Sequence, residues 1–307
     1  MRGYGELGWY AFGVRAAIRN LRVNQASLGW KKTIGKILQP INAYTRFPEY
    51  QLFHEAIWRE VSGCTELRRE ILDVGSPKLF GFFLASEYGM GIHLTDLNPK
   101  EIEEYSTMWS ALCGGARGSA VLERQDARAL TYKDGSYDIV YSMSALEHVE
   151  GKGADSLAVR ELWRVLKPRG LLIFSVPFGD RYQEQTATGF SYSLTPAQRG
   201  KSDFFQRIYD REELKARLLA HLEPCPAETR HYTVYRSRMK FAAMGYHRLR
   251  KHLGVDIIGL FGFLNPLLSA LLNRHCEGYA QDLLVSYGPE HSLSDIYADA
   301  VLVCRKP

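Results

Sequence analysis

The chain has 307 residues, of which 46% are hydrophobic and 24% are charged, and its formal net charge is +5. This composition is that of a folded globular protein, which excludes a disordered or collagen-like chain. The charge is mild for the length, and the basic residues do not form a long interleaved groove, so we do not expect a nucleic-acid partner. The length allows one large core with an elaboration.

The cysteines and the first residues bear on the compartment. The five cysteines are scattered, without a Cys-x-x-Cys pair, which excludes a zinc knuckle or a redox dithiol of that spacing. An odd number without framework spacing is typical of a reducing compartment, and we predict the cytoplasm. Glu6, Arg15 and Arg19 interrupt the apolar residues near the start, so we expect no signal peptide.

The most apolar segment is 255–272, VDIIGLFGFLNPLLSALL. It contains Asp256, two glycines and an Asn265-Pro266 break, which disfavour a membrane-spanning helix. We therefore predict two short packed helices for this segment.

Strands and helices alternate between about residues 70 and 177. Short apolar runs are followed by segments with helical spacing, which predicts an α/β fold with a doubly wound, mostly parallel sheet covered on both faces. The strands are predicted at 71–74, 92–95, 120–126, 137–144 and 171–178, and a final strand is predicted within 297–307.

The clearest helix start in this block is at Asn98. Asn98 is predicted as the N-cap, Pro99 occupies the first helical position, and Glu101 completes a capping box. Apolar residues then recur at helical spacing until Gly114 and Gly115 stop the helix.

The flanking segments are less regular, and the chain divides by composition. Residues 180–203 are polar and rich in Gly, Ser and Thr, which predicts a loop, and 238–275 is a basic and then apolar insertion predicted to be helical. The predicted division is a helical N-terminal cap at 1–62, a core at 63–237 that includes the 180–203 loop, the insertion at 238–275, and the end of the core sheet at 276–307.

Three acidic residues lie at the ends of three successive predicted strands: Asp73, Asp96 and Asp126. Ligands of doubly wound sheets bind beyond the carboxyl ends of the strands. Asp96 can accept hydrogen bonds from the ribose hydroxyls of an adenosine ligand, and Asp126 can accept from an adenine amino group. Gly75 allows close approach of the backbone to a ligand. The alternative interpretation is that the three carboxylates only cap strand ends and form turns.

Five segments occur in an order that resembles the class I S-adenosylmethionine-dependent methyltransferases, notably their small-molecule branch. The segments lie between about residues 68 and 178 and read ILDVGS, LTDLN, RQDARAL, DGSYDIVYSMSALEHVE and ELWRVLKPRGLLIFSVP. The resemblance implies a Rossmann-like sheet of seven strands and S-adenosylmethionine as the cofactor. The cofactor-binding residues that it implies, together with the strand-end carboxylates, are Asp73, Gly75, Ser76, Asp96, Leu97, Asp126, Ala127, Ser142 and Met143.

The glycine-rich turn after the first strand departs from the expected pattern. Pro77 and Leu79 stand where further glycines are expected. A dinucleotide lays its pyrophosphate on such a turn, so the departure disfavours a nicotinamide oxidoreductase. S-adenosylmethionine has no phosphate and tolerates a bulkier turn, with Pro77 as the first residue of the next helix. Lys78 is interpreted either as a partner of the cofactor carboxylate or as a solvated side chain.

His148 is the candidate catalytic residue, as a general base for an acceptor that must lose a proton. The alternative is a residue at a helix start that binds the backbone. In one related group, the ubiquinone-pathway O-methyltransferases, a Glu-x-x-Glu-His pattern at this place binds a divalent metal. Ser144 replaces the first carboxylate here, so we predict no metal site.

The methyl acceptor is expected to contact the additions to the core. Six Lys or Arg residues and no acidic residue lie between 236 and 251, just before the apolar segment. This pattern is typical of a peripheral membrane contact through 236–272 or of a lipid-linked or phosphorylated acceptor. A solvated helix beside a hydrophobic cap is the alternative.

The sequence thus predicts methyl transfer from S-adenosylmethionine to a small-molecule, sugar-linked or lipid-linked acceptor, with oxygen favoured as the accepting atom. The alternative is a methyltransferase-like protein that binds the cofactor or a partner without turnover.

Overall fold

The computed structural model describes residues 11–16, 18–19, 46–62, 69–188, 202–224, 230–237, 273–279 and 298–307. The predicted segment 255–272, most of the 238–275 insertion, and most of the 180–203 loop lie outside these residues.

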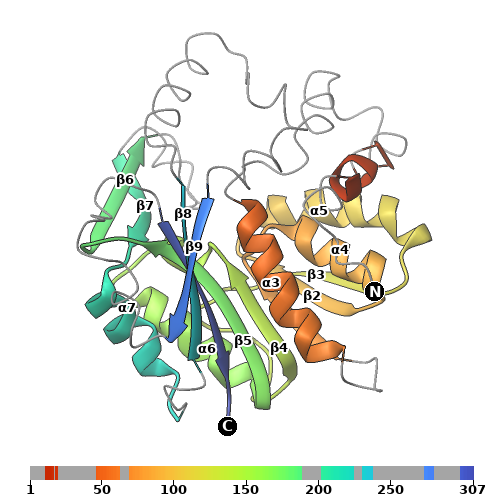
Figure 1. Cartoon of the computed structure of the whole chain (residues 1–307). Helices are drawn as coiled ribbons and strands as arrows, with labels where there is room; N and C mark the ends of the chain where they lie inside the picture. Colours follow the sequence, from red (N-terminus) through yellow and green to blue (C-terminus); the bar gives the residue numbers. More distant parts are fainter. Residues whose placement is uncertain are drawn as a thin grey trace.

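A sheet of eight strands forms the centre of the described structure (Figure 1), in the order β3-β2-β1-β4-β5-β10-β8-β9. The strands β1 (Glu70–Val74), β2 (Gly91–Asp96), β3 (Ser119–Arg124), β4 (Tyr137–Met143) and β5 (Leu166–Phe178) are parallel to one another. The strands β10 (Ala298–Arg305), β8 (Arg230–Ser237) and β9 (Asn273–Tyr279) continue the sheet through antiparallel pairs. The predicted α/β, doubly wound and mostly parallel class is confirmed.

The eighth strand is an addition to the seven predicted strands. It is β9, which pairs with β8 at the edge of the sheet. Its first three residues fall in the segment predicted to be helical. Its sequence, NRHCEGY, is polar and lacks an apolar alternation, so only the pairing with β8 defines it as a strand.

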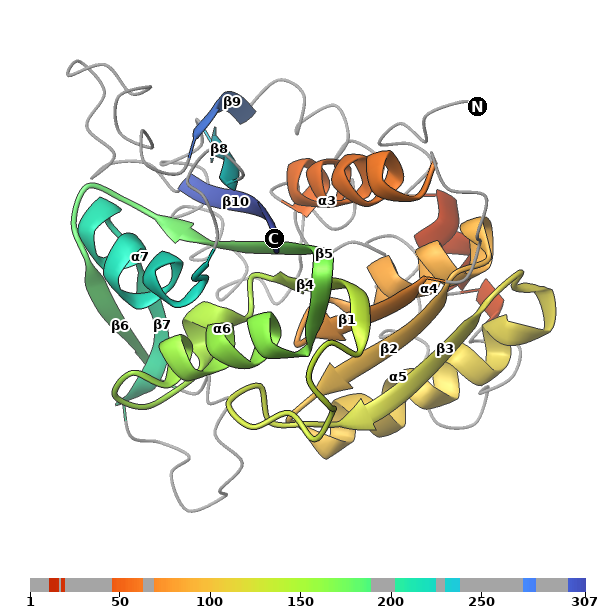
Figure 2. The same ribbon diagram turned by 90° about the horizontal axis from the view of Figure 1, so that it is seen from below.

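Alternate residues of the parallel strands pack on opposite faces. Ile71 and Ile139 belong to the cluster beneath α3 (Arg46–Val61), α4 (Lys78–Tyr88) and α5 (Pro99–Leu112), which lie together in Figure 1. Leu72 and Val140 belong to the other cluster, beneath α6 (Ala154–Val165) and α7 (Arg211–Arg217), seen together in Figure 2. Because both faces are covered, the strands are apolar runs rather than alternating ones.

The helix α3 lies within the segment 1–62 that is predicted as a helical N-terminal cap. Phe53 and Ile57 of α3 are fully buried against the sheet, as their one-turn spacing predicts. The helix also reaches the end of the sheet, where Arg305 Nη2 of β10 forms an ion pair of 2.5 Å with Glu60 Oε2.

The start of α5 differs from the prediction in one bond. Asn98 is the N-cap and Pro99 begins the helix, as predicted, but the Asn98 side chain accepts from Lys100 N. The backbone N–H of Asn98 donates to Asp96 Oδ1 over 2.9 Å, which is the bond that the capping box assigned to Glu101. The helix ends at Leu112, and the short 3-10 helix η1 (Cys113–Gly115) follows it at the two predicted glycines.

The segment predicted as a loop at 180–203 contains strand structure at both ends. β6 (Gln183–Thr188) pairs antiparallel with β7 (Ser202–Ile208) in a separate two-stranded sheet. The letters QEQTAT are polar throughout, so the sequence gives no strand period, and pairing with β7 decides the conformation.

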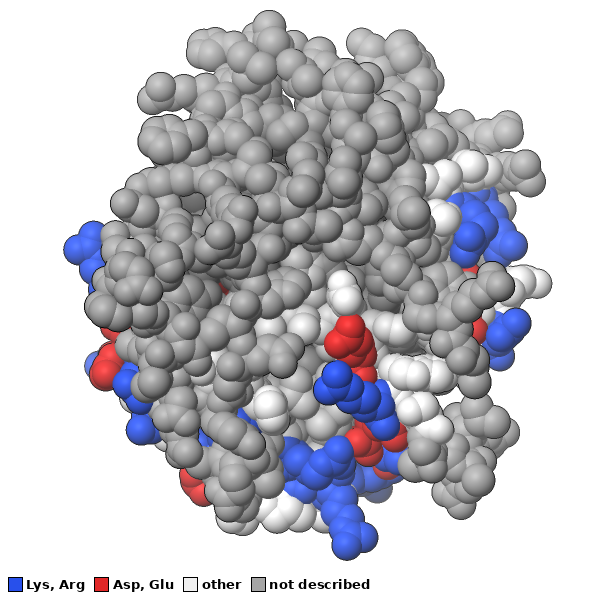
Figure 3. Space-filling view, viewed as in Figure 1, with Lys and Arg blue, Asp and Glu red and all other residues white. Residues whose placement is uncertain are grey.

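Charged side chains on the face of Figure 3 are interspersed in sign. Over the described part of that face, acidic and basic residues lie next to one another, which agrees with the small net charge. Among the described residues, we find no helix with the length and apolar character needed to cross a membrane.

Candidate active site

The candidate site lies where the strand order reverses. The chain passes from β1 to β2 and β3 on one side, and then crosses to β4 on the other side of β1. The connections that leave the carboxyl ends of β1 and β4 therefore diverge, which is where doubly wound sheets bind ligands. The predicted cofactor-binding residues lie at the carboxyl ends of β1, β2 and β4 or in the connections that leave β1, β2 and β3.

Hydrogen bonds join the four connections directly. Gly75 N donates to Thr95 O over 3.0 Å, which ties the loop after β1 to the end of β2. Gln125 N donates to Asp96 O over 3.0 Å, which adds the loop after β3. Met143 N donates to Ser76 Oγ over 2.8 Å, which adds the end of β4. The predicted segments are thus brought together.

Gly75 is needed at its position. Its φ is +73°, in the left-handed region that favours glycine, and an added Cβ would lie 2.9 Å from Ala145 Cβ. The loop after β1 therefore packs against the first residues after β4. Pro77, with φ −58°, is the N-cap of α4. The sequence predicts it to be the first residue of this helix, which instead begins at Lys78.

Lys78 lies in the protein interior. Its side chain is 1% exposed, and Nζ donates to Asp73 Oδ1 (2.9 Å), Ser76 O (2.7 Å) and Thr95 O (2.8 Å). An ammonium has three donors, and all three are used. Both interpretations of Lys78, as a partner of the cofactor carboxylate or as a solvated side chain, are therefore wrong.

Asp73 supports the turn from beneath. Its side chain is fully buried, and Oδ1 also accepts from Ser76 N over 3.1 Å. Burial raises the pKa of the Asp73 carboxyl, while the Lys78 ammonium acts in the opposite direction. The Asp73 side chain contacts the turn residues rather than the surface.

Asp96 and Leu97 face outward at the end of β2. The Asp96 side chain is 23% exposed, with Oδ1 bonded to Asn98 N and Oδ2 at 3.7 Å from Lys78 Nζ. Leu97 is 38% exposed, an apolar side chain next to the carboxylate. A hydrogen-bond acceptor beside an exposed apolar surface suits a ribose attached to a flat base.

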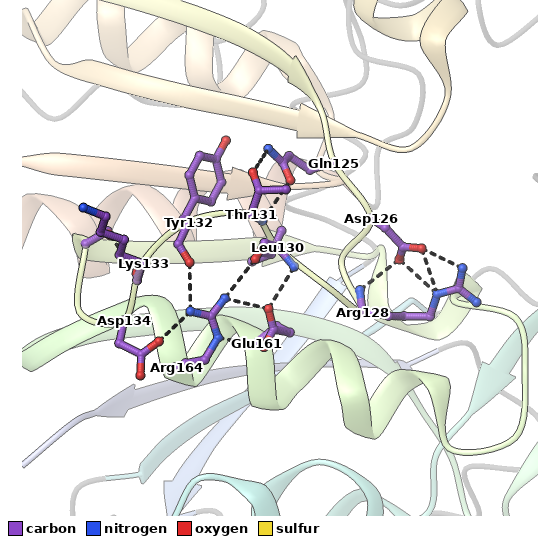
Figure 4. Close-up of polar contacts among 11 residues, drawn as sticks. Gln125, Asp126, Arg128, Leu130, Thr131, Tyr132, Lys133, Asp134, Glu161 and Arg164 are labelled. Carbon is purple, nitrogen blue, oxygen red and sulfur yellow. Dashed lines mark hydrogen bonds and ion pairs between the residues drawn. The ribbon is translucent and has the colours of Figure 1, made fainter.

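Asp126 lies in the loop after β3, because the strand ends at Arg124 rather than at the predicted residue 126. Figure 4 shows its carboxylate facing Arg128, whose Nη2 and Nε donate over 2.7 and 2.9 Å. The hydrogen bonds from Arg128 lower the pKa of Asp126. Ala127 packs against the hydrophobic core beneath α6.

The rest of this loop is anchored on α6 (Figure 4). Arg164 donates to Leu130 O and Tyr132 O over 2.9 and 2.8 Å, and its partner Glu161 accepts from Leu130 N over 2.8 Å. The loop that carries Asp126 is therefore bonded to α6 at its far end and, through Gln125 N, to the end of β2 at its near end.

Ser142 and Met143 are fully buried at the end of β4. Ser142 Oγ donates to Val74 O over 2.8 Å, across to β1. Met143 reaches the loops through its backbone N–H. Both residues set the position of the next one, Ser144, which leaves β4 with φ +45°.

Sequence reasoning missed Glu49, which α3 carries to the ends of β4 and β5. It is 1% exposed, and its Oε1 accepts from Ser144 Oγ over 2.5 Å and from Ser175 Oγ over 2.7 Å. Ser175 Oγ in turn accepts from Ser144 N over 2.9 Å. A carboxylate from the N-terminal cap thus lies beside the serine that replaces the first acidic residue of the metal-binding pattern.

His148 lies in the 3-10 helix η2 (Leu146–His148), three residues beyond Ala145. Its Nδ1 donates to Phe205 O of β7 over 2.7 Å, and its Nε2 is 3.7 Å from Glu147 Oε1. The bond to a carbonyl places a proton on Nδ1, so in the neutral ring Nε2 is the basic atom. The side chain is 16% exposed. Within the described residues, no group of three or more His, Cys, Asp or Glu is arranged to hold a metal ion.

Part of the sequence matches a known protein family. Residues 72–174, about a third of the chain, match the family described as "Methyltransferase domain". The matched segment begins within β1 and ends within β5, so it contains the residues that meet at the strand ends.

Curated relatives also match part of the chain. A 2-methyl-6-phytyl-1,4-hydroquinone methyltransferase of Synechocystis sp. is 30% identical over 90 residues, 29% of this chain and 26% of that protein. An uncharacterized methyltransferase of Mycolicibacterium gilvum is 30% identical over 128 residues, 40% of this chain and 47% of that protein. The chain therefore matches less than half the length of these relatives.

Two solved structures are also similar. One is a SAM-dependent methyltransferase of Methanosarcina mazei, with a TM-score of 0.46 and 16% identity, covering 80% of this chain and 96% of that one. The other is phosphoethanolamine N-methyltransferase 2 of Haemonchus contortus with S-adenosyl-L-methionine, with a TM-score of 0.47 and 15% identity, covering 82% of this chain and 51% of that one.

Residues 72–174 of this chain are therefore similar to a methyltransferase domain. This match agrees with the methyltransferase family and the S-adenosylmethionine cofactor that the sequence predicts.

Proposed function

We propose that the whole chain transfers a methyl group from S-adenosylmethionine to an oxygen atom of a small-molecule, sugar-linked or lipid-linked acceptor. The observation that carries this proposal is the meeting of four strand-end connections around Gly75 and the partly exposed Asp96 carboxylate, held by the bonds from Gly75 to Thr95 and from Gln125 to Asp96. The carboxylate and the adjacent Leu97 fit an adenosine.

The residues that would hold the cofactor follow from their positions. Asp96 would accept from the ribose hydroxyls, and Leu97 and the Asp126–Ala127 segment would contact the adenine. Gly75 and Ser76 would face the methionine portion, with Ser142 and Met143 below. When bound, S-adenosylmethionine supplies a methyl group on a positively charged sulfur, open to in-line displacement, so the protein mainly has to align the acceptor.

Oxygen is favoured because of His148. A hydroxyl must lose its proton during methylation, and a neutral imidazole held through Nδ1 presents Nε2 as the proton acceptor. His148 lies just after β4, close in sequence to Ala145, which contacts the Gly75 turn. Glu49 and Ser144 provide polar groups beside the same strand end.

Ligand binding tests the cofactor site. Calorimetry with S-adenosylhomocysteine should show binding by the wild type and a loss of about tenfold or more for Asp96→Ala, since hydrogen bonds to a charged group are removed. A matched control is Asp138→Ala, whose carboxylate pairs with Lys167 at the other end of the sheet. No binding by the wild type at millimolar ligand would contradict the proposal.

Turnover tests the catalytic part. With a labelled methyl donor and fractionated metabolites, mass spectrometry should reveal a product, and fragmentation should place the methyl group on oxygen. His148→Gln should lower kcat by about 10²–10⁴-fold without weakening S-adenosylhomocysteine binding, whereas His221→Gln, in a 3-10 helix beside α6, should leave both unchanged. Binding without any product across these fractions would favour the non-catalytic alternative.

The acceptor class and the location are proposed from the sequence. The basic and apolar stretch 236–272 supports contact with anionic lipid, and sedimentation with anionic vesicles at low and high salt tests it. Cys113 is an exposed free thiol in the structure, which supports the cytoplasm as the compartment. The division of the chain into cap, core and insertion is part of the same proposal.

A further inference from the structure

The interrupted glycine turn is held by a side chain. Lys78 begins α4, and its buried ammonium bonds to an atom of β1, one of the turn and one of β2: Asp73 Oδ1, Ser76 O and Thr95 O. In a glycine-rich turn, backbone segments can approach each other closely because glycine has no side chain. Here the ammonium fills the space between the segments and joins them.

Thr95 is the point where these bonds meet. Its carbonyl accepts from both Gly75 N and Lys78 Nζ, and its Oγ1 donates to Asp73 O over 2.8 Å. The residue next to it is Asp96. The Asp96 backbone thus follows a residue that is bonded to the β1 turn, while the Asp96 side chain is held by Asn98 N at the start of α5.

The Asp96 carboxylate also faces the ammonium. Its Oδ2 lies 3.7 Å from Lys78 Nζ, while Oδ1 is held by Asn98 N at 2.9 Å. The Asp96 side chain is 23% exposed, so the other lone pairs of its carboxylate can accept hydrogen bonds from a ligand. An acceptor oriented in this way matches the two neighbouring hydroxyls of a ribose.

We propose that Lys78 is a positioning residue for the donor site: it takes over the structural role of the missing glycines and orients Asp96 toward the ribose hydroxyls. This inference rests on the proposed function and adds that ribose recognition depends on a buried lysine. Lys78 itself does not touch the ligand, because its three N–H groups are used inside the protein.

A single Lys78→Met variant would leave Asp73 buried without its counter-charge and can fail to fold. We therefore compare the single variant Asp73→Asn, in which the Lys78 ammonium keeps the Asp96 carboxylate at 3.7 Å as a counter-charge, with a double variant that carries both Asp73→Asn and Lys78→Met. The asparagine side chain introduced at position 73 keeps an oxygen for Ser76 N, so the two proteins differ only in the ammonium. Circular dichroism and thermal melting verify that both are folded.

Two ligands separate positioning from general support of the fold. The first is S-adenosylhomocysteine, and the second is its analogue without the two ribose hydroxyls, which has nothing to offer Asp96. Adding Lys78→Met to the single variant should weaken binding of the first ligand by about tenfold or more and of the second by less than about twofold. In an Asp96→Ala background, the Lys78→Met substitution should cause no further loss for either ligand, because the group that the lysine orients is absent.

Equal losses for the two ligands, or no loss for S-adenosylhomocysteine, would overturn the inference. The proposed function fails separately, because it requires that the wild type bind S-adenosylhomocysteine at all. A wild type that binds and a double variant that binds equally well would refute only the role of Lys78.

Discussion

Two buried carboxylates hold different parts of this molecule together, and they do so with different numbers of cations. Asp73 has one ammonium, shared with two carbonyls, and joins the loops of the candidate site. Asp155, at the first turn of α6, accepts from Arg217 Nε and Nη2 over 2.7 and 2.8 Å and from Tyr209 Oη over 2.9 Å, with Arg207 Nε at 3.8 Å.

The difference appears in the acidity of the two groups. Burial raises the pKa of Asp73, because one shared ammonium does not offset the loss of water. Burial also acts to raise the pKa of Asp155, but the hydrogen bonds from Arg217 and the charge of Arg207 outweigh it, and the pKa is lowered. Asp155 is therefore an anchor of the scaffold.

Arg207 extends this anchor to the connection that carries His148. It is 2% exposed, and its Nη1 and Nη2 donate to Val149 O and Gly151 O over 2.6 and 2.8 Å. The strand β7 thus contacts the segment after β4 at two places, through the bonds from Arg207 and through the bond from His148 to Phe205 O. The two carboxylates act on the two sides of one site.

The largest expected effect is from Asp155→Ala. It leaves Arg207 and Arg217 without their shared counter-charge, which should lower the free energy of unfolding by about 3–5 kcal/mol in urea denaturation. The control is Glu184→Gln, because Glu184 also contacts Arg207, at 3.3 Å, but its side chain is 51% exposed. That change should cost less than about 1 kcal/mol. A loss of less than about 1 kcal/mol for Asp155→Ala would contradict the conclusion that Asp155 stabilises the scaffold.

Acid should erase the difference between wild type and Asp155→Asn. The folded-state pKa of Asp155 lies below its unfolded value, which is about 3.9. Its ionisation therefore stabilises the protein above the unfolded pKa, and this stabilisation is lost as the pH falls through the folded pKa. Denaturation of both proteins from pH 7 downward should show a constant gap that narrows below about pH 4. A gap that widens in acid would refute the lowered pKa.

In α4, the helix that begins at Lys78, a substitution at Gly81 changes packing rather than charge. An added Cβ there would lie 2.3 Å from Leu94 Cδ2 and 3.1 Å from Tyr141 Oη, both in the core. Gly81→Ala should push α4 from the sheet and cost about 1–3 kcal/mol, even though alanine favours a helix. Gly114→Ala is the control, since nothing lies within 4 Å of its added Cβ. If the two substitutions have equal effects on the free energy of unfolding, the close approach of α4 to the sheet does not require glycine at position 81.

The sequence predicts the parallel part of the sheet and several site residues because their signals are local. Buried strands are short apolar runs, Asn98-Pro99 marks a helix start, and Asp96 ends its strand. The strands β6 and β9 lack such a signal, because polar strands are defined by their partners.

The contacts of the site that were missed are tertiary. Glu49 meets Ser144 and Ser175 across 95 and 126 residues of chain, and no local pattern encodes such a meeting. Lys78 had a weak signal, since it begins the helix KLFGFFLASEY, which is apolar on most sides. A lysine in such a helix, five residues after a buried-strand aspartate, is a candidate for a buried pair.

The smallest expected effect on stability is at the third carboxylate, Asp126. Its partner Arg128 is 42% exposed, so Arg128→Ala should change the free energy of unfolding by less than about 1 kcal/mol. If Asp126 accepts from the adenine amino group, removing Arg128 frees its oxygens, and S-adenosylhomocysteine should bind as well as before or more tightly. Asp126→Ala should weaken the same binding. Calorimetry of both variants decides the point: equal losses would mean that the ion pair, rather than the carboxylate, shapes the adenine side of the site.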